Sequence, residues 1–279
     1  NQYLLNKYYP DAAAQADRAW YIGSDYCVGD GLLLGEQAGA DIVGYNRGLL
    51  LTTPNFKKEL EVYVPGWLVY VNREGRRFVN EMAEYAVMSG VIGAQTGGSC
   101  FAVFDDEARV TAKPNRQYED AFAAGMISLN WVTEEIDVQC KAGKVIQADT
   151  LEQLETQCGL RPGSLQSTLD QYNQDIEAGA DSAFFKDHGE MKPVATPPFY
   201  AVEIFPAIIC LTSTGLRINK KTQVLDQRGQ VVPGLFAAGE TTGEVLGERY
   251  IGGGNSIANA IVFGRVAGQE AASETARHN

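Results

Sequence analysis

Hydrophobic and polar positions along the chain predict a mixture of helices and short strands. The apolar residues of DGLLLGEQA predict a helix from about Gly31 to Ala38, and residues 41–43 predict a short strand after it. Apolar and polar residues alternate in GWLVYVNREGRRFVNE on both sides of an REG turn, which is the pattern of a β-hairpin. The apolar run in SCFAVFDDEARV predicts a strand from Cys100 to Phe104.

Two helices are predicted in TLEQLETQCGLRPGSLQSTLDQYNQDIEAG. The break at Arg161-Pro162-Gly163 separates them, because proline and glycine end a helix. Ser164 is the expected N-cap of the second helix, and Leu165, Leu169 and Tyr172 lie on one of its faces. These three side chains are therefore candidates for the core.

The last third of the chain returns to strands. The segments FYAVEIFPAIICL, GLRIN, TQVLD and QVVPGLFAAG predict strands, and a long helix is expected from Asn255 to about Thr275. We predict an α/β fold with two lobes. Residues 1–48 and 201–279 pack together, and residues 49–200 form an inserted capping domain, because cofactor-like blocks occur in the outer segments only.

Composition and charge narrow the possible functions. The 279 residues suffice for one large domain or two smaller ones. The net charge of −12 opposes binding to nucleic acid or to an anionic membrane, and no apolar run is long enough for a transmembrane helix. Five scattered cysteines without a CxxC pair indicate reduced thiols and a cytoplasmic location. Only two histidines are present, so neither a metal site nor a histidine-based triad is expected.

The stretch GERYIGGGNSIANAIVFGRVAG places three glycines directly before the last predicted helix. A helix N-terminus carries unpaired N–H groups and partial positive charge, so it suits a phosphate or an anionic ring. The small residues of PGLFAAGE would let a ligand approach the end of the preceding strand. A tight turn followed by a core helix explains the same residues without any ligand. The residues alone leave both interpretations open.

Four blocks together resemble one protein family. GLFAAGETTGEVLGERYIGGGNSIANAIVFGRVAG is similar to the C-terminal flavin segment of the fumarate reductase/succinate dehydrogenase flavoproteins, which include acrylate-type reductases and 3-ketosteroid dehydrogenases. VGDG (Val28–Gly31), VNREGRRFVNE (Val71–Glu81) and TSTGLRIN (Thr212–Asn219) resemble further family blocks in the same order. The resemblance implies FAD as cofactor. It also implies the C-terminal portion of a Rossmann-like FAD-binding domain with an inserted α+β capping domain.

The family's dinucleotide fingerprint GxGxxG has no counterpart. In GDGLLLG, the nearest match, the third glycine comes one position late and no buried strand precedes it. The resemblance therefore implies the C-terminal part of a longer flavoprotein, whose missing N-terminal half is a partner in holding FAD. The alternative is a folded fragment that neither binds FAD nor has activity of its own. The oligomeric state stays open.

The resemblance also implies which residues contact FAD. These are Asp30 of the GDG block, Gly239 and Glu240 of the AGE block, and Asn255, Ser256 and Ile257 at the start of the last helix. The pyrimidine edge of the flavin would lie at that helix start, and Glu240 would face the ribityl chain. From the residues alone, Asp30 is also a candidate helix N-cap.

The substrate residues of the fumarate reductases are largely replaced. Where those enzymes have two arginines and a histidine, this chain has Tyr85, Tyr250 and Cys210. A dicarboxylate would therefore lack its charge partners, which is costly in a closed site. Tyr85 and Tyr250 instead resemble the tyrosines of 3-ketosteroid dehydrogenases.

In those enzymes the second tyrosine and a glycine N–H, here Tyr250 and Gly254, hold the ketone oxygen. The first tyrosine, here Tyr85, exchanges a proton. The expected activity adds or removes hydrogen across a C–C bond next to a carbonyl of a small-molecule substrate, such as a 3-oxosteroid or another enone. Glu240 follows the reductase branch, so reduction of fumarate, urocanate or an acrylate is the alternative. For any single tyrosine, half-buried packing is the simpler reading.

Overall fold

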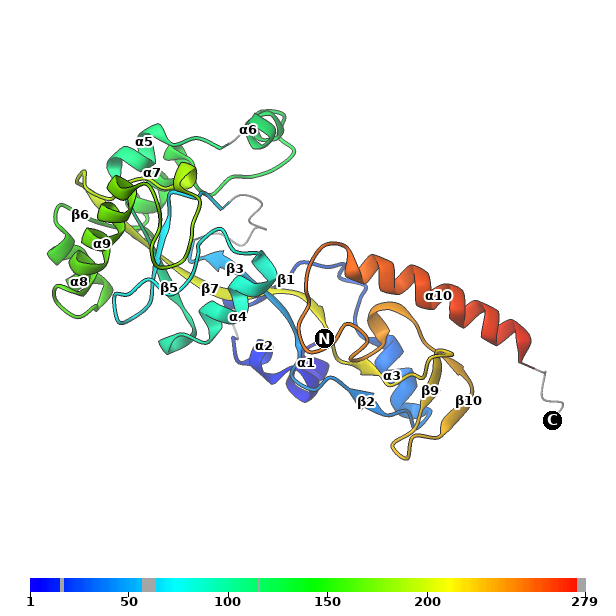
Figure 1. The fold of residues 1–279 in the computed structure, drawn as a ribbon. Coiled ribbons are helices and arrows are strands. Elements are labelled where there is room, and N and C mark those ends of the chain that lie inside the picture. Colours follow the sequence, from blue (N-terminus) through cyan, green and yellow to red (C-terminus); the bar gives the residue numbers. More distant parts are fainter. Residues whose placement is uncertain (16–17, 57–63, 115, 275–279) are drawn as a thin grey trace. The chain divides into compact units, whose positions relative to one another are not determined.

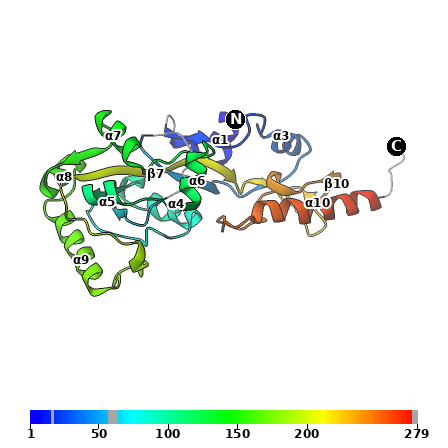
Figure 2. The same cartoon turned by 90° about the horizontal axis from the view of Figure 1, so that it is seen from above.

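The computed structural model describes residues 1–15, 18–56, 64–114 and 116–274 (Figure 1). The chain divides into two compact units. Unit 1 combines Asn1–Leu51 with Ala207–Asn279, and unit 2 is Thr52–Pro206. Two strands run from one unit into the other, β3 (Gly48–Pro54) and the 14-residue β7 (Phe199–Thr212), the long strand in Figure 2. The mixed α/β class predicted from the sequence is confirmed.

Unit 2 is a sheet with helices on both faces. Strands β4 and β5 pair antiparallel, and β5 and β6 each pair antiparallel with the first half of β7. Its elements are β4 (Val69–Val71), α4 (Tyr85–Gly93), a 3₁₀ turn (Thr96–Gly98), β5 (Cys100–Asp105), α5 (Asp106–Thr111), α6 (Arg116–Ala123), α7 (Thr133–Lys141), β6 (Ile146–Ala148), α8 (Leu151–Cys158), α9 (Ser164–Ala178) and a 3₁₀ turn (His188–Glu190).

The core of unit 2 has two layers because side chains alternate along a strand. In β5, Cys100 and Phe104 point into one cluster, together with Ile92 of α4. Phe101 and Val103 point into the other cluster, which α8 and α9 cover. The predicted apolar face of the second helix is confirmed, because its three side chains are buried in that second cluster: Leu165, Leu169 and Tyr172.

The predicted hairpin in GWLVYVNREGRRFVNE is confirmed at its REG turn, where Asn72 N–H donates to the Arg76 carbonyl at 3.0 Å, but it does not continue beyond the turn. Strand β4 pairs with β5, and the return arm makes only one bridge, between Val71 and Arg77. The reason is a side chain: Glu81 Oε1 accepts the backbone N–H of Tyr70 at 3.0 Å, where a strand would supply a carbonyl. The return arm therefore leaves the ladder after one pair.

The break between α8 and α9 is as predicted, but the cap is different. Gly163, with φ 76°, is the N-cap of α9, and Ser164 is its first helical residue. The buried carboxylate of Glu155 accepts the N–H groups of Gly163 and Leu165, both at 2.7 Å. The Ser164 hydroxyl instead donates to the Arg161 carbonyl at 2.6 Å. A side chain from the preceding helix thus caps α9.

Unit 1 contains short strands and one long helix. Its elements are α1 (Gln2–Tyr8), α2 (Pro10–Ala14), β1 (Trp20–Tyr21), α3 (Asp30–Gln37), β2 (Ile42–Val43), β8 (Gly215–Leu216), β9 (Gln223–Leu225), β10 (Val231–Phe236), a 3₁₀ turn (Gly239–Thr241) and α10 (Asn255–Ser273). Strand β1 is parallel to the second half of β7, and β2 is antiparallel to β8.

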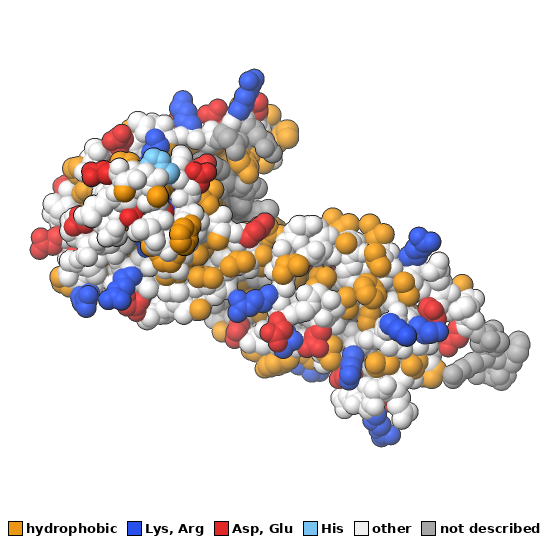
Figure 3. All heavy atoms as spheres, viewed as in Figure 1, with side chains coloured by type: hydrophobic (Ala, Val, Ile, Leu, Met, Phe, Trp, Pro, Cys, Tyr) orange, Lys and Arg blue, Asp and Glu red, His pale blue; other side chains and the backbone are white. Residues whose placement is uncertain are grey.

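The strand that ends in the AGE block is not part of a parallel sheet. Strand β10 pairs antiparallel with β9 in a two-stranded sheet. We expected a ligand at the end of this strand because α/β proteins bind ligands at the carboxyl ends of parallel strands. That reason does not apply to an antiparallel strand. The long helix begins at Asn255 as predicted. Three large apolar side chains on it are exposed to solvent: Ile257, Ile261 and Val262. Hydrophobic side chains, drawn in orange, are visible at the surface in Figure 3.

Candidate cofactor site

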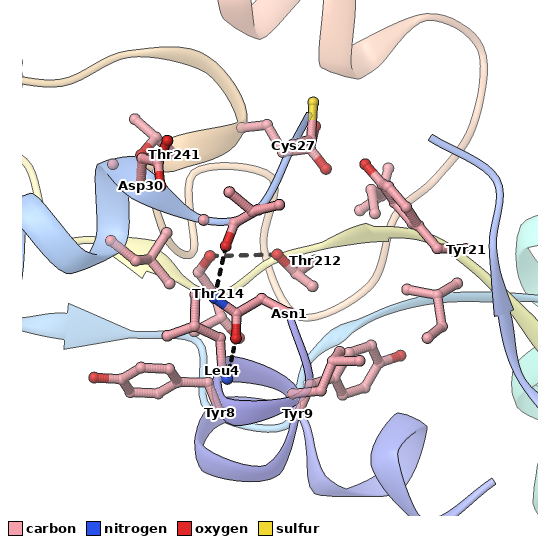
Figure 4. Close-up of a pocket in the computed structure, with 18 of the residues that line it drawn as sticks. Asn1, Leu4, Tyr8, Tyr9, Tyr21, Cys27, Asp30, Thr212, Thr214 and Thr241 are labelled. Carbon is pink, nitrogen blue, oxygen red and sulfur yellow. Dashed lines mark hydrogen bonds between the residues drawn. The ribbon is translucent and has the colours of Figure 1, made fainter. Parts of the chain in front are cut away.

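Four segments of unit 1 surround a cavity of about 420 Å³ (Figure 4). They are α1 with the residue before it, the loop from Tyr26 into α3, the end of β7 with Thr214, and the 3₁₀ turn that contains Glu240 and Thr241. Tyr8, Tyr9 and Tyr21 add aromatic walls. Two of the blocks picked out in the sequence, GDG and AGE, thus meet at one cavity.

Helix α3 begins at the cavity because Gly29 permits the required backbone. Gly29 is its N-cap with φ 90°, a conformation that favours glycine. Asp30 is the first helical residue, so the expectation that Asp30 is the N-cap is wrong. Its carboxylate lies in the first turn, where the helix dipole favours negative charge. Asp30 lines the cavity, as does Glu240.

The backbone of the AGE segment passes in direct contact with the backbone of the TSTG block. A methyl group on Gly215 would lie 2.4 Å from the carbonyl carbon of Thr242, and one on Gly243 would lie 2.6 Å from the Gly215 oxygen. Thr214 donates its hydroxyl to the Gly44 carbonyl at 2.7 Å. The glycines in these two blocks therefore let two segments cross without side chains between them.

Three buried polar atoms at this site have no hydrogen-bond partner among the described residues. Thr241 Oγ1 belongs to a lining residue of the large cavity. Ser213 Oγ and Asn259 Oδ1 belong to residues that line a second cavity of about 20 Å³, which Glu240 and Ser256 also line. A buried polar group without a partner is costly, so these atoms fit a polar ligand or water.

Burial shifts the acid–base properties of the cavity wall. Desolvation raises the pKa of Glu240 above its usual value, against the opposing hydrogen bond from the Thr212 backbone. Desolvation also raises the pKa of Tyr21, with further increases from Cys27 and Glu240. Cys210, between the lining residues Ile209 and Leu211 in the sequence, does not itself line the cavity, and desolvation raises the pKa of its half-buried thiol too. All five cysteines are free thiols.

The GGG segment gives α10 an open N-terminus. Gly252, Gly253 and Gly254 have φ values of 78°, 67° and 84°, which favour glycine in each case. The space beside Gly253 and Gly254 is open, so backbone conformation rather than crowding requires glycine there. No side chain caps α10, and its first turn contains no acidic residue. The N–H groups of residues 255–257 therefore remain donors for a ligand.

The remaining predicted site residues are distributed over both units. Gly239 is buried, with φ 74°, and packs against Ala260 of α10. Tyr250 is half-buried in the loop before the glycines, and Arg47 holds that loop through Glu244 at 2.8 Å and Glu248 at 3.0 Å. Tyr85 is the first residue of α4 in unit 2 and is 47% exposed.

Sequence reasoning missed several lining residues of the large cavity. Thr241 follows the predicted Glu240 directly, and Thr212 and Thr214 belong to the TSTG block, so adjacency to those motifs was the available signal. Tyr21 and Cys27 carry no motif. Their place at the cavity follows from the pairing of β1 with β7 and from the loop into α3.

Comparison with known proteins identifies the family. The family described as FAD binding domain matches residues 7–257. The chain belongs to this family of FAD-binding proteins. It is 34% identical to an NADH:acrylate oxidoreductase of Vibrio harveyi, over 97% of this chain and 25% of that protein. It is 33% identical to a fumarate reductase (cytochrome) of Shewanella frigidimarina, over 88% of this chain and 39% of that protein.

The fold also matches a solved enzyme structure. A 3-ketosteroid Δ1-dehydrogenase from Sterolibacterium denitrificans, crystallised with 1,4-androstadiene-3,17-dione, superposes with a TM-score of 0.77 at 23% identity, covering 98% of this chain and 51% of the other. This likeness concerns the fold. The FAD-binding chain thus spans about a quarter to two fifths of the length of the two relatives above.

FAD is the cofactor that family membership indicates, and the residues of unit 1 fit such a group. The unpaired Thr241 hydroxyl, the open start of α10 and the cavity beside Asp30 provide donors and room for a polar cofactor. No helix in the described part of the chain is long and apolar enough to cross a membrane. The described residues also contain no cluster of three side chains suited to a metal ion.

Proposed function

We propose that the protein containing this chain adds or removes hydrogen across a C–C bond next to a carbonyl of a 3-oxosteroid or another enone. One observation carries the proposal: an FAD-binding chain has tyrosines at the two positions, Tyr85 and Tyr250, where the resemblance to fumarate reductases calls for arginine. A neutral ketone needs hydrogen-bond donors rather than the paired cations that a dicarboxylate requires.

Each proposed residue has one role. Tyr250 donates its hydroxyl, and Gly254 its N–H, to the ketone oxygen, which stabilises the charge that develops there. Tyr85 exchanges the proton on the neighbouring carbon. When bound, FAD accepts or delivers the hydride. Asp30, Gly239, Glu240, Asn255, Ser256 and Ile257 hold the cofactor in this proposal, and the pyrimidine edge lies at the start of α10.

A preceding half of the FAD-binding domain completes the site in this proposal. The chain has no GxGxxG fingerprint, so residues outside it hold the ADP half of FAD. Ile257, Ile261 and Val262 on α10 provide an apolar surface for that half to cover. The five scattered free thiols support a reducing compartment and thus the cytoplasm.

Reduction of an unsaturated carboxylate is the second candidate. The 34% identity to an acrylate oxidoreductase favours it. Glu240 in the AGE block supports it too, because that block follows the reductase branch. The two candidates differ in the charge of the substrate, so one assay series separates them.

The experiment compares substrates and tyrosine variants of the natural full-length protein. We expect turnover with a 3-oxosteroid or a cyclic enone, and little with acrylate or fumarate. Tyr85→Phe should slow turnover about 100-fold, and Tyr250→Phe should cost about 2–4 kcal/mol in the transition state. The exposed Tyr45→Phe is the matched control. Faster turnover of acrylate or fumarate, with both tyrosine variants at the wild-type rate, would contradict the proposal.

A further inference from the structure

The Arg47 guanidinium binds two carboxylates of the loop that carries Tyr250. Its Nη1 donates to Glu244 Oε1 at 2.8 Å, and its Nη2 donates to Glu248 Oε1 at 3.0 Å. All of these residues belong to unit 1. Among the described residues, these two bonds are the only side-chain hydrogen bonds or ion pairs that residues 243–254 make. Arg47 therefore provides the polar contacts of this loop with other side chains.

The backbone around Arg47 is itself fixed. The carbonyl of Arg47 accepts the N–H of Ser213, which follows β7, at 2.9 Å. The preceding residue, Asn46, donates its N–H to the Tyr8 carbonyl at 2.7 Å, and its side-chain oxygen accepts the N–H of Asp11 at 3.0 Å. The end of β7 and the helices α1 and α2 thus hold the point from which the Arg47 side chain starts.

The backbone of Glu244 has an uncommon conformation. Its φ is 61°, in the left-handed region that residues with a side chain rarely adopt. Its N–H donates to the Ser213 carbonyl at 3.0 Å, and its own carbonyl accepts the N–H of Gly247 at 2.9 Å. Ser213 therefore bonds to Arg47 with its N–H and to Glu244 with its carbonyl. Such a conformation persists where the surrounding structure fixes it, and such residues cluster at functional sites.

The two ion pairs matter more for the loop than for the stability of the fold. Between 34% and 77% of each of the three side chains is exposed, and exposed ion pairs contribute little to stability. The loop contains four glycines with positive φ, Gly247 and residues 252–254, and glycine loses the most conformational freedom when it becomes ordered. The contacts to Arg47 select one arrangement of this loop. Glu248 is only two residues from Tyr250.

We infer that Arg47 is a positioning residue for Tyr250. By holding the two glutamates, it sets the course of the loop and with it the place of the Tyr250 hydroxyl. This inference rests on the proposed function for the role of Tyr250 at the ketone oxygen. A donor stabilises developing charge only when it is already aimed at it, and a displacement of about 1 Å can cost about 100-fold in rate.

The test removes the contact from either side in the full-length protein, with a cyclic enone as substrate. Arg47→Met removes the guanidinium, and Glu244→Ala with Glu248→Ala removes both of its partners. Each change should lower kcat about tenfold, with little change in KM or flavin content. The amide hydrogens of residues 244–250 should exchange faster than in the wild type.

Combining the two changes and replacing the arginine conservatively test whether the contact itself is responsible. Arg47→Met together with both alanine substitutions should lower kcat no further than either change alone, because all of them remove the same interaction. Arg47→Lys keeps the positive charge and should restore part of both readouts. A lysine variant as slow as Arg47→Met, with equally fast exchange, would contradict a role for the charge.

Lys221→Met is the matched control for the loss of an exposed ion pair. Lys221 Nζ lies 3.2 Å from Glu270 Oε2 in the same unit, and its side chain is 55% exposed. This variant should keep the wild-type kcat and the wild-type exchange of residues 244–250. Losses equal to those of Arg47→Met in both readouts would overturn the inference, since any exposed ion pair would then have the same effect.

A Tyr250→Phe background separates this inference from the proposed function. In that background Arg47→Met should lower kcat no further, because the hydroxyl that Arg47 positions is gone. Additive losses, or wild-type exchange of residues 244–250 in Arg47→Met, would overturn the inference. A wild-type rate for Tyr250→Phe would instead reject the proposed function, and amide exchange would still decide whether Arg47 positions the loop.

Discussion

Gly31 lies directly against Thr241: a methyl group on Gly31 would stand 2.3 Å from the Thr241 hydroxyl oxygen. The two residues belong to the GDG and AGE blocks, which are 210 positions apart in the sequence (241 − 31). Their contact forms one wall of the large cavity. Residue 31 must therefore be small for the GDG and AGE blocks to meet.

Gly31→Ala tests this contact. The added methyl group forces Thr241 to move, so we expect the purified full-length protein to retain several-fold less FAD than the wild type. Flavin absorbance near about 450 nm relative to protein provides the measurement. Gly189→Ala in unit 2 is the matched control, because a methyl group at that exposed position would make only an ordinary contact, with Asp187 at 3.5 Å. Equal flavin content in the two variants would show that the contact of Gly31 with Thr241 is not needed for FAD binding.

Thr241→Val tests the unpaired hydroxyl. In the protein without FAD, the substitution removes a buried polar atom that has no partner among the described residues, so stability should stay the same or rise by about 1 kcal/mol. If FAD supplies the partner, the variant should bind FAD about tenfold more weakly, which corresponds to about 1.4 kcal/mol. Thermal unfolding with and without added FAD measures both effects. The same shift in both conditions would show that the hydroxyl does not face the cofactor.

Glu155→Gln tests the cap of α9. The carboxylate accepts three backbone N–H groups, from Gly163, Leu165 and Gln166. The neutral amide can replace fewer of these bonds, so we expect a loss of about 1–3 kcal/mol in unfolding free energy. Urea unfolding provides the measurement, and Glu152→Gln on the exposed side of the same helix is the control. A loss of unfolding free energy no larger than that of the control would show that Glu155 does not stabilise the start of α9.

Asp181 predicts a specific loss of stability in acid. Desolvation would raise its pKa, but hydrogen bonds from Arg77 and from backbone N–H groups lower it in the folded protein to about 2. Its contribution is therefore present above the unfolded pKa of about 3.9 and disappears as the pH falls towards 2. Asp181→Asn should therefore be less stable than the wild type at pH 7, and the difference should shrink below pH 4. Thermal unfolding at several pH values measures it. A difference that is independent of pH would mean that the substitution acts through shape alone.

The sequence predicted those elements whose signals are local. The Arg161-Pro162-Gly163 break and the glycines before α10 act within a few residues of the structure that they determine. The hairpin ends after one pair and the Ser164 cap was wrong, because two side chains, Glu81 and Glu155, accept the backbone N–H groups in question. The pattern of hydrophobic and polar residues does not show which side chain will accept a given backbone N–H group.

The candidate site likewise contains residues that the sequence predicted and residues that it did not. Motif residues such as Asp30 and Glu240 were found, and they share one cavity. Thr241 and Tyr21 were missed because the folded chain, rather than a motif, brings them there. The roles of Tyr85 and Tyr250 stay predictions, since one lies in each unit.

Anaerobic reoxidation of the reduced flavin in the full-length protein tests the central proposal most directly. The recovery of flavin absorbance is followed by stopped flow after mixing with a cyclic enone, with acrylate or with fumarate. We predict rapid reoxidation by the enone alone, slowed about 100-fold by Tyr85→Phe. Rapid reoxidation by acrylate or fumarate, unaffected by that substitution and absent with the enone, would contradict the account.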